Sequence, residues 1–83
     1  MPIAEDIRKA LYRRCGGQCE CDMAGCKSHE PRRRCSNHLY SDSWGAFRIR
    51  PRGGDQLRNL RAVCPDCLKR IQAMPGAVVL SAG

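Results

Sequence analysis

The chain has 83 residues, a formal net charge of +7 and seven cysteines. A chain of this length forms one domain, residues 1–83, and such small domains are commonly stapled by disulfides or metal ions. No apolar run is long enough to cross a membrane, so a membrane-spanning role is excluded. Twelve of the fifteen basic residues are arginine, which favours polyanionic partners, although a GC-rich genome would enrich arginine as well.

The cysteines are predicted to bind metal rather than to pair as disulfides. Their number is odd, their spacings include Cys-x-x-Cys and Cys-x-Cys, and two histidines lie among them. The first residues lack the basic and apolar segments of a secretion signal, so we expect a cytoplasmic location, where thiols stay reduced. The expected cofactor is therefore zinc, as one or two ions.

Residues 2–14 are predicted to form an amphipathic helix that packs on the zinc-binding region as a lid. Ile3, Ile7 and Leu11 recur at helical spacing and give one apolar stripe. Two glycines, Gly16 and Gly17, are expected to end this helix.

Residues 15–38 form a loop with few apolar side chains, so metal ligation is expected to order it. Together with the Cys-x-x-Cys pair at residues 64–67, this loop offers enough donors for two four-ligand sites. Cys15 is the expected spare, because it lies at the helix end beside two glycines. The candidate metal ligands are Cys19, Cys21, Cys26, His29, Cys35, His38, Cys64 and Cys67.

The division of these ligands between sites is open at this point. The Cys-x-x-Cys pair needs two upstream thiolates, for which we expect Cys26 together with Cys19 or Cys21. A second site would combine the other member of that pair with His29, Cys35 and His38. If only one ion binds, the second group is a reduced loop.

The second half of the chain, residues 44–74, is predicted to carry a strand, a turn and a helix. Apolar and basic residues alternate over residues 46–50, which predicts a half-buried strand with Arg48 and Arg50 on one face. A glycine-containing turn and an apolar run follow, and a helix over residues 65–74 begins at the Cys-x-x-Cys pair. The tail, residues 75–83, is either a docked strand or frayed.

Residues 44–71 resemble the core of the HNH (His-Asn-His, ββα-metal) endonuclease family. The strand end at Pro51, a Gly-Gly pair, an Asn-Leu step at Asn59 and the Cys-x-x-Cys knuckle follow in the family's order. Upstream, residues 14–21 resemble the family's entry to its first knuckle, and residues 19–35 are similar to an extended zinc-binding form of bacterial and phage members. This resemblance covers about two thirds of the chain. It implies a small α+β zinc-stapled domain, with a treble-clef or ββα-metal core and an N-terminal helix, in a bacterial or phage-infected cell.

The residues that perform catalysis in that family are replaced in this chain. Arg48, Phe47 and Leu68 stand where the resemblance places the general-base His, the metal-binding Asp and the last His. A guanidinium cannot accept a proton, and apolar side chains cannot bind a metal ion. Only Asn59 is kept, and the resemblance assigns it to holding a loop. We therefore expect no catalytic residues and no enzyme.

The resemblance then implies a catalytically inactive HNH-like zinc module that binds nucleic acid, DNA rather than RNA, mainly by contacts to phosphates. The expected nucleic-acid-binding residues are Arg48, Arg50, Arg52, Arg58, Arg61, Lys69 and Arg70. A run of three arginines, Arg32, Arg33 and Arg34, either adds a second contact or is simply solvated.

Two alternative functions stay open. A small phage- or mobile-element-type regulator would bind and modulate a host protein, and an exposed patch of Trp44 with the apolar tail would favour this function. An active metal-dependent nuclease would need relocated catalytic residues, with His38 as the base and Asp42 on the metal.

Overall fold

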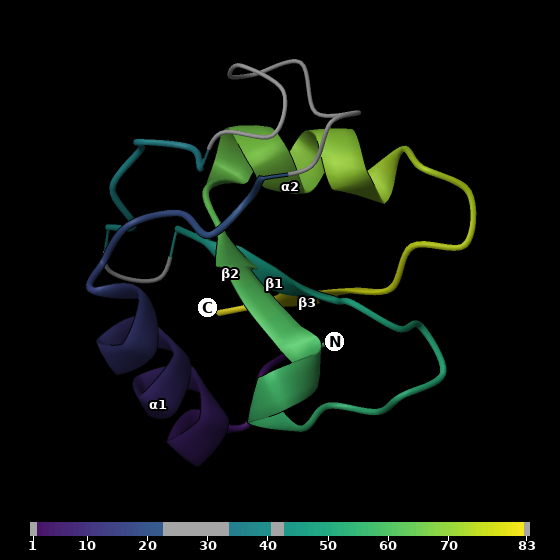
Figure 1. Cartoon of the computed structure of the whole chain (residues 1–83), viewed down its shortest axis with the longest axis horizontal. Coiled ribbons are helices and arrows are strands. Elements are labelled where there is room, and N and C mark those ends of the chain that lie inside the picture. The colour runs from purple at the N-terminus through teal and green to yellow at the C-terminus, as the bar shows by residue number, and fades with distance from the viewer. Residues whose placement is uncertain (1, 23–33, 41–42, 83) are drawn as a thin grey trace.

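The computed structural model describes residues 2–22, 34–40 and 43–82. These residues form two α-helices and a three-stranded antiparallel sheet of order β2-β1-β3, which is a small α+β fold (Figure 1). No helix in this part of the chain has the length and apolar character needed to span a bilayer. In chain order the elements are α1 (Glu5–Cys15), β1 (Gly45–Arg48), the 3-10 helix η1 (Leu57–Asn59), β2 (Leu60–Val63), α2 (Pro65–Gln72) and β3 (Val79–Ser81).

Helix α1 begins at Glu5, so the start predicted at residue 2 is wrong. The first residues join the sheet instead, because the Ile3 amide donates to the Ser81 carbonyl at 2.9 Å. Ile3 is buried through this contact rather than through a helical stripe. The predicted glycine stop is confirmed, since Gly16 caps α1 in the left-handed region with φ 65°.

Strand β1 is central in the sheet, which explains why its residues do not alternate between buried and exposed. Gly45, Ala46 and Phe47 are all buried. β2 and β3 pair with β1 on its two edges, and α2 packs against it. A strand with neighbours on both edges and a helix on one face buries consecutive residues, whereas a half-buried strand buries every second residue.

The strand ends at Arg48, so the prediction that Arg48 and Arg50 share one strand face is wrong. The chain leaves the sheet because the Arg50 amide donates to the side chain of Asn59 rather than to a neighbouring strand. Gly53 then closes a turn by donating to the Arg50 carbonyl at 2.8 Å.

The C-terminal tail is docked rather than frayed, because β3 pairs with β1 and buries Leu80 to 2% exposure. Trp44, which precedes β1, is also only 2% exposed, and its ring lies 6.0 Å from that of Tyr12. The exposed patch of Trp44 and tail residues that would favour a protein-binding regulator therefore does not form.

Helix α2 follows β2 directly and packs on all three strands. Cys64 is its N-cap residue and a proline occupies its first turn. Ile71 points inward as predicted, with 1% exposure. The helix ends at Gln72, earlier than the predicted residue 74, because the Met74 amide donates to the Ile71 carbonyl and tightens the last turn.

Candidate metal centre and basic surface

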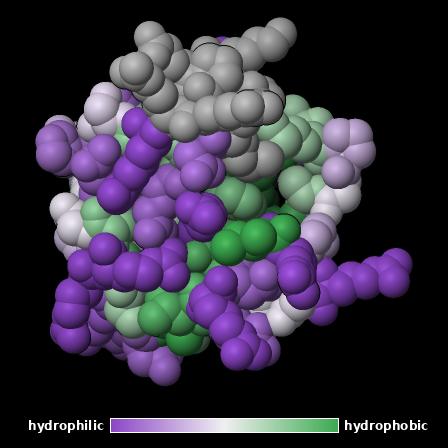
Figure 2. All heavy atoms as spheres, in the orientation of Figure 1, coloured by the Kyte–Doolittle hydropathy of each residue, from purple (hydrophilic) through white to green (hydrophobic). Residues whose placement is uncertain are grey.

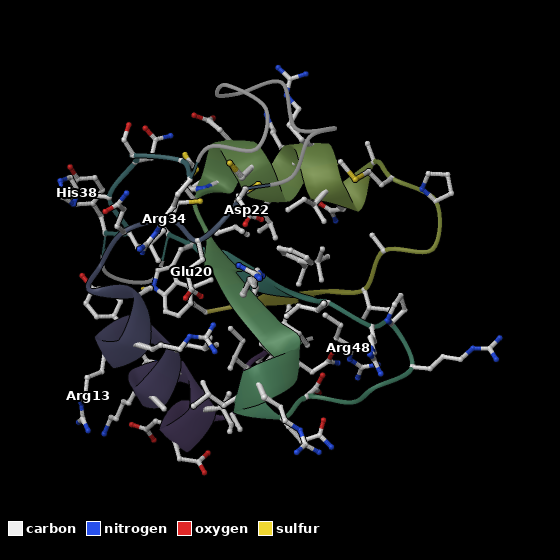
Figure 3. The ribbon with its side chains drawn as sticks, viewed as in Figure 1. Arg13, Glu20, Asp22, Arg34, His38 and Arg48 are labelled. Carbon is white, nitrogen blue, oxygen red and sulfur yellow. The ribbon has the colours of Figure 1, made fainter. Side chains whose placement is uncertain are left out.

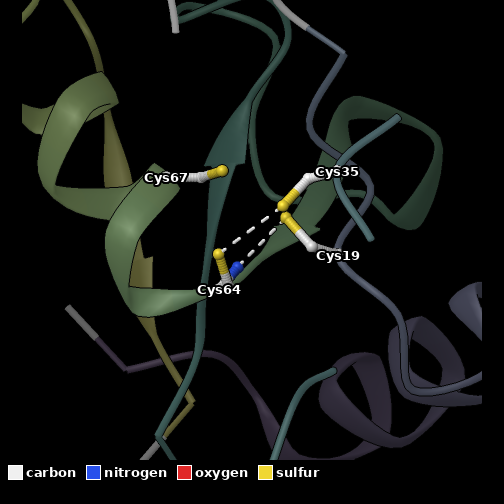
Figure 4. A group of neighbouring side chains, drawn as sticks. All are labelled: Cys19, Cys35, Cys64 and Cys67. Atoms are coloured by element: carbon white, nitrogen blue, oxygen red, sulfur yellow. Dashed lines mark hydrogen bonds between the residues drawn. The ribbon is translucent and has the colours of Figure 1, made fainter. Parts of the chain in front are cut away.

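Four cysteine side chains from three separate parts of the chain converge at the N-terminal end of α2 (Figure 4). Their Sγ atoms all lie within 4.8 Å of one another, and all four residues are buried. We call this group, Cys19, Cys35, Cys64 and Cys67, the cysteine cluster.

Backbone hydrogen bonds bring the upstream cysteines to α2. The segment that follows α1 pairs with the segment that precedes β1, since the Cys19 amide donates to the Asn37 carbonyl at 2.9 Å. The first of these segments is tied to β2, because the Glu20 amide donates to the Ala62 carbonyl at 2.7 Å. Cys64 caps α2, and Cys67 lies in its first turn. The cluster therefore depends on non-local pairing for two of its members and on helix geometry for the other two.

The sulfur spacing fits a tetrahedral ion. Metal–sulfur bonds of about 2.3 Å give a tetrahedron edge of about 3.8 Å, and the Cys35 and Cys64 Sγ atoms are 4.0 Å apart. Two N–H groups are placed to stabilise thiolate charge: the Cys64 amide donates to Cys19 Sγ at 3.2 Å, and the Asn37 side chain donates to Cys64 Sγ at 3.4 Å. The four cysteines could therefore bind a metal ion.

Two thiols of the cluster have opposite pKa shifts. Burial, reinforced by the neighbouring Cys64 and Cys35 thiolates, raises the pKa of Cys19 to about 12. Burial also acts on Cys64, but hydrogen bonds from the Asn37 side chain and the Cys67 backbone outweigh it and lower the pKa of that thiol. A bound cation would displace the Cys19 proton, so we expect metal binding to release protons.

The predicted ligands divide into three groups. The structure brings together Cys19, Cys64 and Cys67 with Cys35, which the sequence analysis had assigned to a second site. Cys21 is buried but outside the cluster, and His38 is exposed at the edge of the molecule (Figure 3). Cys26 and His29 lie outside the described residues. Within residues 2–22, 34–40 and 43–82, the cysteine cluster is the single group that could hold an ion.

Cys15, the expected spare, also lies outside the cluster. It is buried at the end of α1, and its Sγ contacts the Tyr12 carbonyl at 3.4 Å. Helix geometry explains this contact, because the side chain reaches back over the preceding turn.

Arg34 has a structural role that the sequence analysis missed. Its guanidinium donates to the carbonyls of Cys19 at 2.9 Å, Cys15 at 2.8 Å and Gln18 at 3.1 Å. Arg34 is exposed, but its hydrogen bonds fix the backbone that carries Cys19 (labelled in Figure 3). Its position beside Cys35 was the one available signal in the sequence. The other two arginines of this run lie outside the described residues.

Arg48 is also engaged within the fold. Its Nε donates to Asp55 Oδ1 at 2.6 Å, and its terminal nitrogen donates to the Pro51 carbonyl at 2.9 Å (labelled in Figure 3). The ion pair spans the turn that follows β1, so Arg48 braces this turn and its charge is balanced locally.

The other predicted nucleic-acid-binding residues are spread over the turn after β1, η1, β2 and α2. Lys69 and Arg70 are exposed on α2, which follows β2, whereas Arg58 is exposed on η1, which precedes it (Figure 1). Arg50, Arg52 and Arg58 have no ion-pair partner in the described part of the chain. Arg61, on β2, lies 3.8 Å from Asp22 in a weak, exposed ion pair.

Two adjoining hollows lie between these arginines. The first has a volume of about 460 Å³ and is lined by Arg50 and Arg58, and the second has a volume of about 250 Å³ and is lined by Arg58 and Arg61. Ile49, which is 46% exposed, lines both hollows. Figure 2, in the orientation of Figure 1, shows the face over β2, where hydrophilic side chains surround hydrophobic atoms. We call Arg50, Arg58, Arg61 and Ile49 the arginine surface.

Asn59 holds the loop that carries this surface. Its Oδ1 accepts the Arg50 amide at 2.9 Å, and its Nδ2 donates to the carbonyls of Arg50 at 2.9 Å and Gly54 at 2.8 Å. Asn59 is 8% exposed, so these hydrogen bonds are largely shielded from water. A Cβ atom on Gly53 would lie 2.7 Å from Asn59 Nδ2, which explains why this turn requires glycine.

Replacing this amide is expected to destabilise the fold. Asn59→Ala would leave the Arg50 amide and the Gly54 carbonyl without the partners that Asn59 provides, at a cost of about 2–3 kcal/mol in the free energy of unfolding. Urea unfolding of metal-loaded protein measures this difference. Gln56→Ala, which truncates an exposed side chain of the same loop, should change the unfolding free energy by less than about 0.5 kcal/mol. Equal stability of the Asn59 variant and the wild type would contradict the role of the amide.

Fold and site together define a small α+β protein with a four-cysteine candidate metal centre. Comparisons of the chain with protein-family models, with curated proteins and with solved structures found no match. An ion held by all four thiolates would have no open coordination position for a substrate.

Proposed function

We propose that this protein is a zinc-stapled module that binds nucleic acid, DNA rather than RNA, through phosphate contacts at the arginine surface. The observation that carries this proposal is the pair of adjoining hollows that share Arg58 and Ile49 and are lined by Arg50 and Arg61. Guanidinium groups bind phosphate oxygens through paired N–H donors. The net charge of +7 would add long-range attraction toward a polyanion.

Zinc is the ion that the cysteine cluster fits best within this proposal. A closed set of four thiolates is typical of structural zinc sites, and soft sulfur ligands disfavour magnesium and calcium. The residues that would hold the ion are those of the cysteine cluster, and the bound ion would tie the segments carrying Cys19 and Cys35 to α2. Iron is the other ion that such a set accepts, and elemental analysis separates the two.

The order β1, η1, β2, α2 supports the proposed kinship with the HNH fold, and so do the loop contacts of Asn59. The proposed module is not an enzyme. Phe47 is buried in the sheet, and Arg48 is paired with Asp55, so neither side chain could bind a metal or accept a proton. His38, the base of the nuclease alternative, lies in a hollow with Asp66, while Asp42 lies outside the described residues.

The experiment that tests this function is a binding titration of metal-loaded protein with a fluorescently labelled DNA duplex across a range of salt concentrations. Three phosphate contacts predict a roughly 40-fold loss of affinity between about 50 and 200 mM salt. Anisotropy measures the affinity at each concentration. Absence of binding at the lowest salt concentration, or affinity that does not depend on salt, would contradict phosphate binding by the arginine surface.

A further inference from the structure

A third hollow reaches one residue of the cysteine cluster. It has a volume of about 400 Å³, and polar side chains such as Ser36, His38 and Asp66 line it together with Cys64. The other three cysteines of the cluster line none of the three hollows. Of the four cysteines of the cluster, Cys64 is therefore the residue that a small polar molecule in one of these hollows would reach.

Two groups lie close to the Cys64 sulfur, a hydrogen-bond donor and a second sulfur atom. The Asn37 side chain, which also lines the hollow, donates to Cys64 Sγ at 3.4 Å and stabilises negative charge on the sulfur. Cys35 Sγ lies 4.0 Å from Cys64 Sγ, and both residues are buried. A disulfide bond is about 2.05 Å long, so modest side-chain rotations would bring these two sulfur atoms together.

We propose that Cys64 is a site of oxidation by hydrogen peroxide, that Cys35 then forms a disulfide with it, and that the bound ion is released. This proposal rests on the proposed metal centre. The Cys64 thiolate attacks one peroxide oxygen, the O–O bond breaks, and Cys64 becomes a sulfenic acid as hydroxide leaves. The Cys35 thiolate attacks the Cys64 sulfur, the S–S bond forms, and a second hydroxide leaves. Two thiolates lose two electrons in total, and peroxide accepts them.

Disulfide formation removes two of the four ligands from the ion. The two remaining thiolates, Cys19 and Cys67, would not retain a structural ion against competing chelators. The segment that carries Cys19 then loses its metal link to α2. Oxidation by peroxide would in this way destabilise the fold that carries the arginine surface.

The test oxidises metal-loaded protein with hydrogen peroxide in the presence of a chromogenic chelator. Free thiols are then alkylated, and the protein is digested with trypsin and with a protease that cleaves before aspartate. Cleavage before Asp66 separates Cys64 from Cys67, and cleavage after Arg34 separates Cys35 from Cys26, so mass spectrometry assigns each sulfur. We expect a Cys35–Cys64 disulfide that accumulates in step with ion release. First oxidation at another cysteine, or ion release without this disulfide, would overturn the proposal.

Two variants test whether peroxide reaches Cys64 through the hollow or whether Cys64 is oxidised regardless of this route. Ser36→Phe, at an exposed position of the hollow, is expected to slow oxidation of Cys64 and ion release together. Gln72→Phe, exposed at the opposite end of α2, is expected to leave both rates unchanged. Equal rates in the two variants would overturn the route through the hollow. Metal content is measured before peroxide is added, so a protein that binds no ion refutes the metal centre itself, whereas a loaded protein that resists oxidation refutes this inference alone.

Discussion

Cys35→Ser is expected to abolish stable metal binding and, with it, the folded structure at 25 °C. Cys35 supplies one of four sulfur atoms within 4.8 Å of one another, and its segment has few apolar side chains to hold it otherwise. Metal binding contributes about 10–16 kcal/mol to the folding of small zinc domains, which equals or exceeds the whole stability of a typical domain. Circular dichroism and elemental analysis of the purified variant measure both effects.

The matched control for this prediction is Cys15→Ser. Cys15 is buried like the members of the cysteine cluster, but it lies outside the cluster. This variant should retain its ion and a cooperative unfolding transition. Treating the wild type with a strong chelator should reproduce the Cys35→Ser spectrum. A Cys35→Ser protein that keeps a full equivalent of zinc and a wild-type spectrum would show that this cysteine is not a ligand.

Reversing two charges of the arginine surface is expected to remove most DNA affinity without unfolding the protein. Arg50 and Arg58 are exposed and line the same hollow, so the double variant Arg50→Glu, Arg58→Glu loses two phosphate contacts and adds repulsion. Two charge-assisted hydrogen bonds contribute about 3 kcal/mol together, which corresponds to a roughly 100-fold loss of affinity. The slope of log affinity against log salt should fall in magnitude by about two.

The control for this prediction is Arg13→Glu. Arg13 is exposed on α1, and its side chain points away from the sheet (Figure 3). One reversal here tests the effect of net charge alone, so only a small uniform change in affinity is expected. Glutamine in place of Arg50 and Arg58 separates lost contacts from added repulsion. If Arg13→Glu weakens binding as much as either single reversal at the arginine surface, the binding is non-specific attraction and not a defined surface.

Several features of the fold could be read from the sequence because they depend on neighbours in the chain. The glycine stop of α1 follows from the left-handed backbone at Gly16. The Cys-x-x-Cys pair places two thiols on the first turn of α2 by helix geometry alone. The inward direction of Ile71 follows in the same way from helical periodicity. These predictions succeeded because each uses spacing within a single element.

The two upstream members of the cysteine cluster, Cys19 and Cys35, were decided by tertiary structure. Cys35 joins Cys64 because its own segment pairs with distant backbone, as in the hydrogen bonds from the Cys35 amide to the Cys21 carbonyl and from the Cys19 amide to the Asn37 carbonyl. Side-chain spacing in the sequence holds no information about that pairing. The same reason explains Trp44, which looked available for a partner and is instead covered in the folded chain.

The basic residues show most clearly the difference between what the sequence determines and what the tertiary structure decides. Composition alone determined that the chain is strongly positive and rich in arginine. It did not determine which guanidinium groups are free, because that depends on acceptors brought close by folding. Arg34 donates to three backbone carbonyls, and Arg48 donates to Asp55 and to one carbonyl. Arg50 and Arg58, by contrast, are exposed to solvent. The sequence by itself therefore determined the net charge and the presence of candidate thiol ligands. The tertiary structure decided which thiols converge and which guanidinium groups are paired, because both depend on contacts that form only in the folded chain.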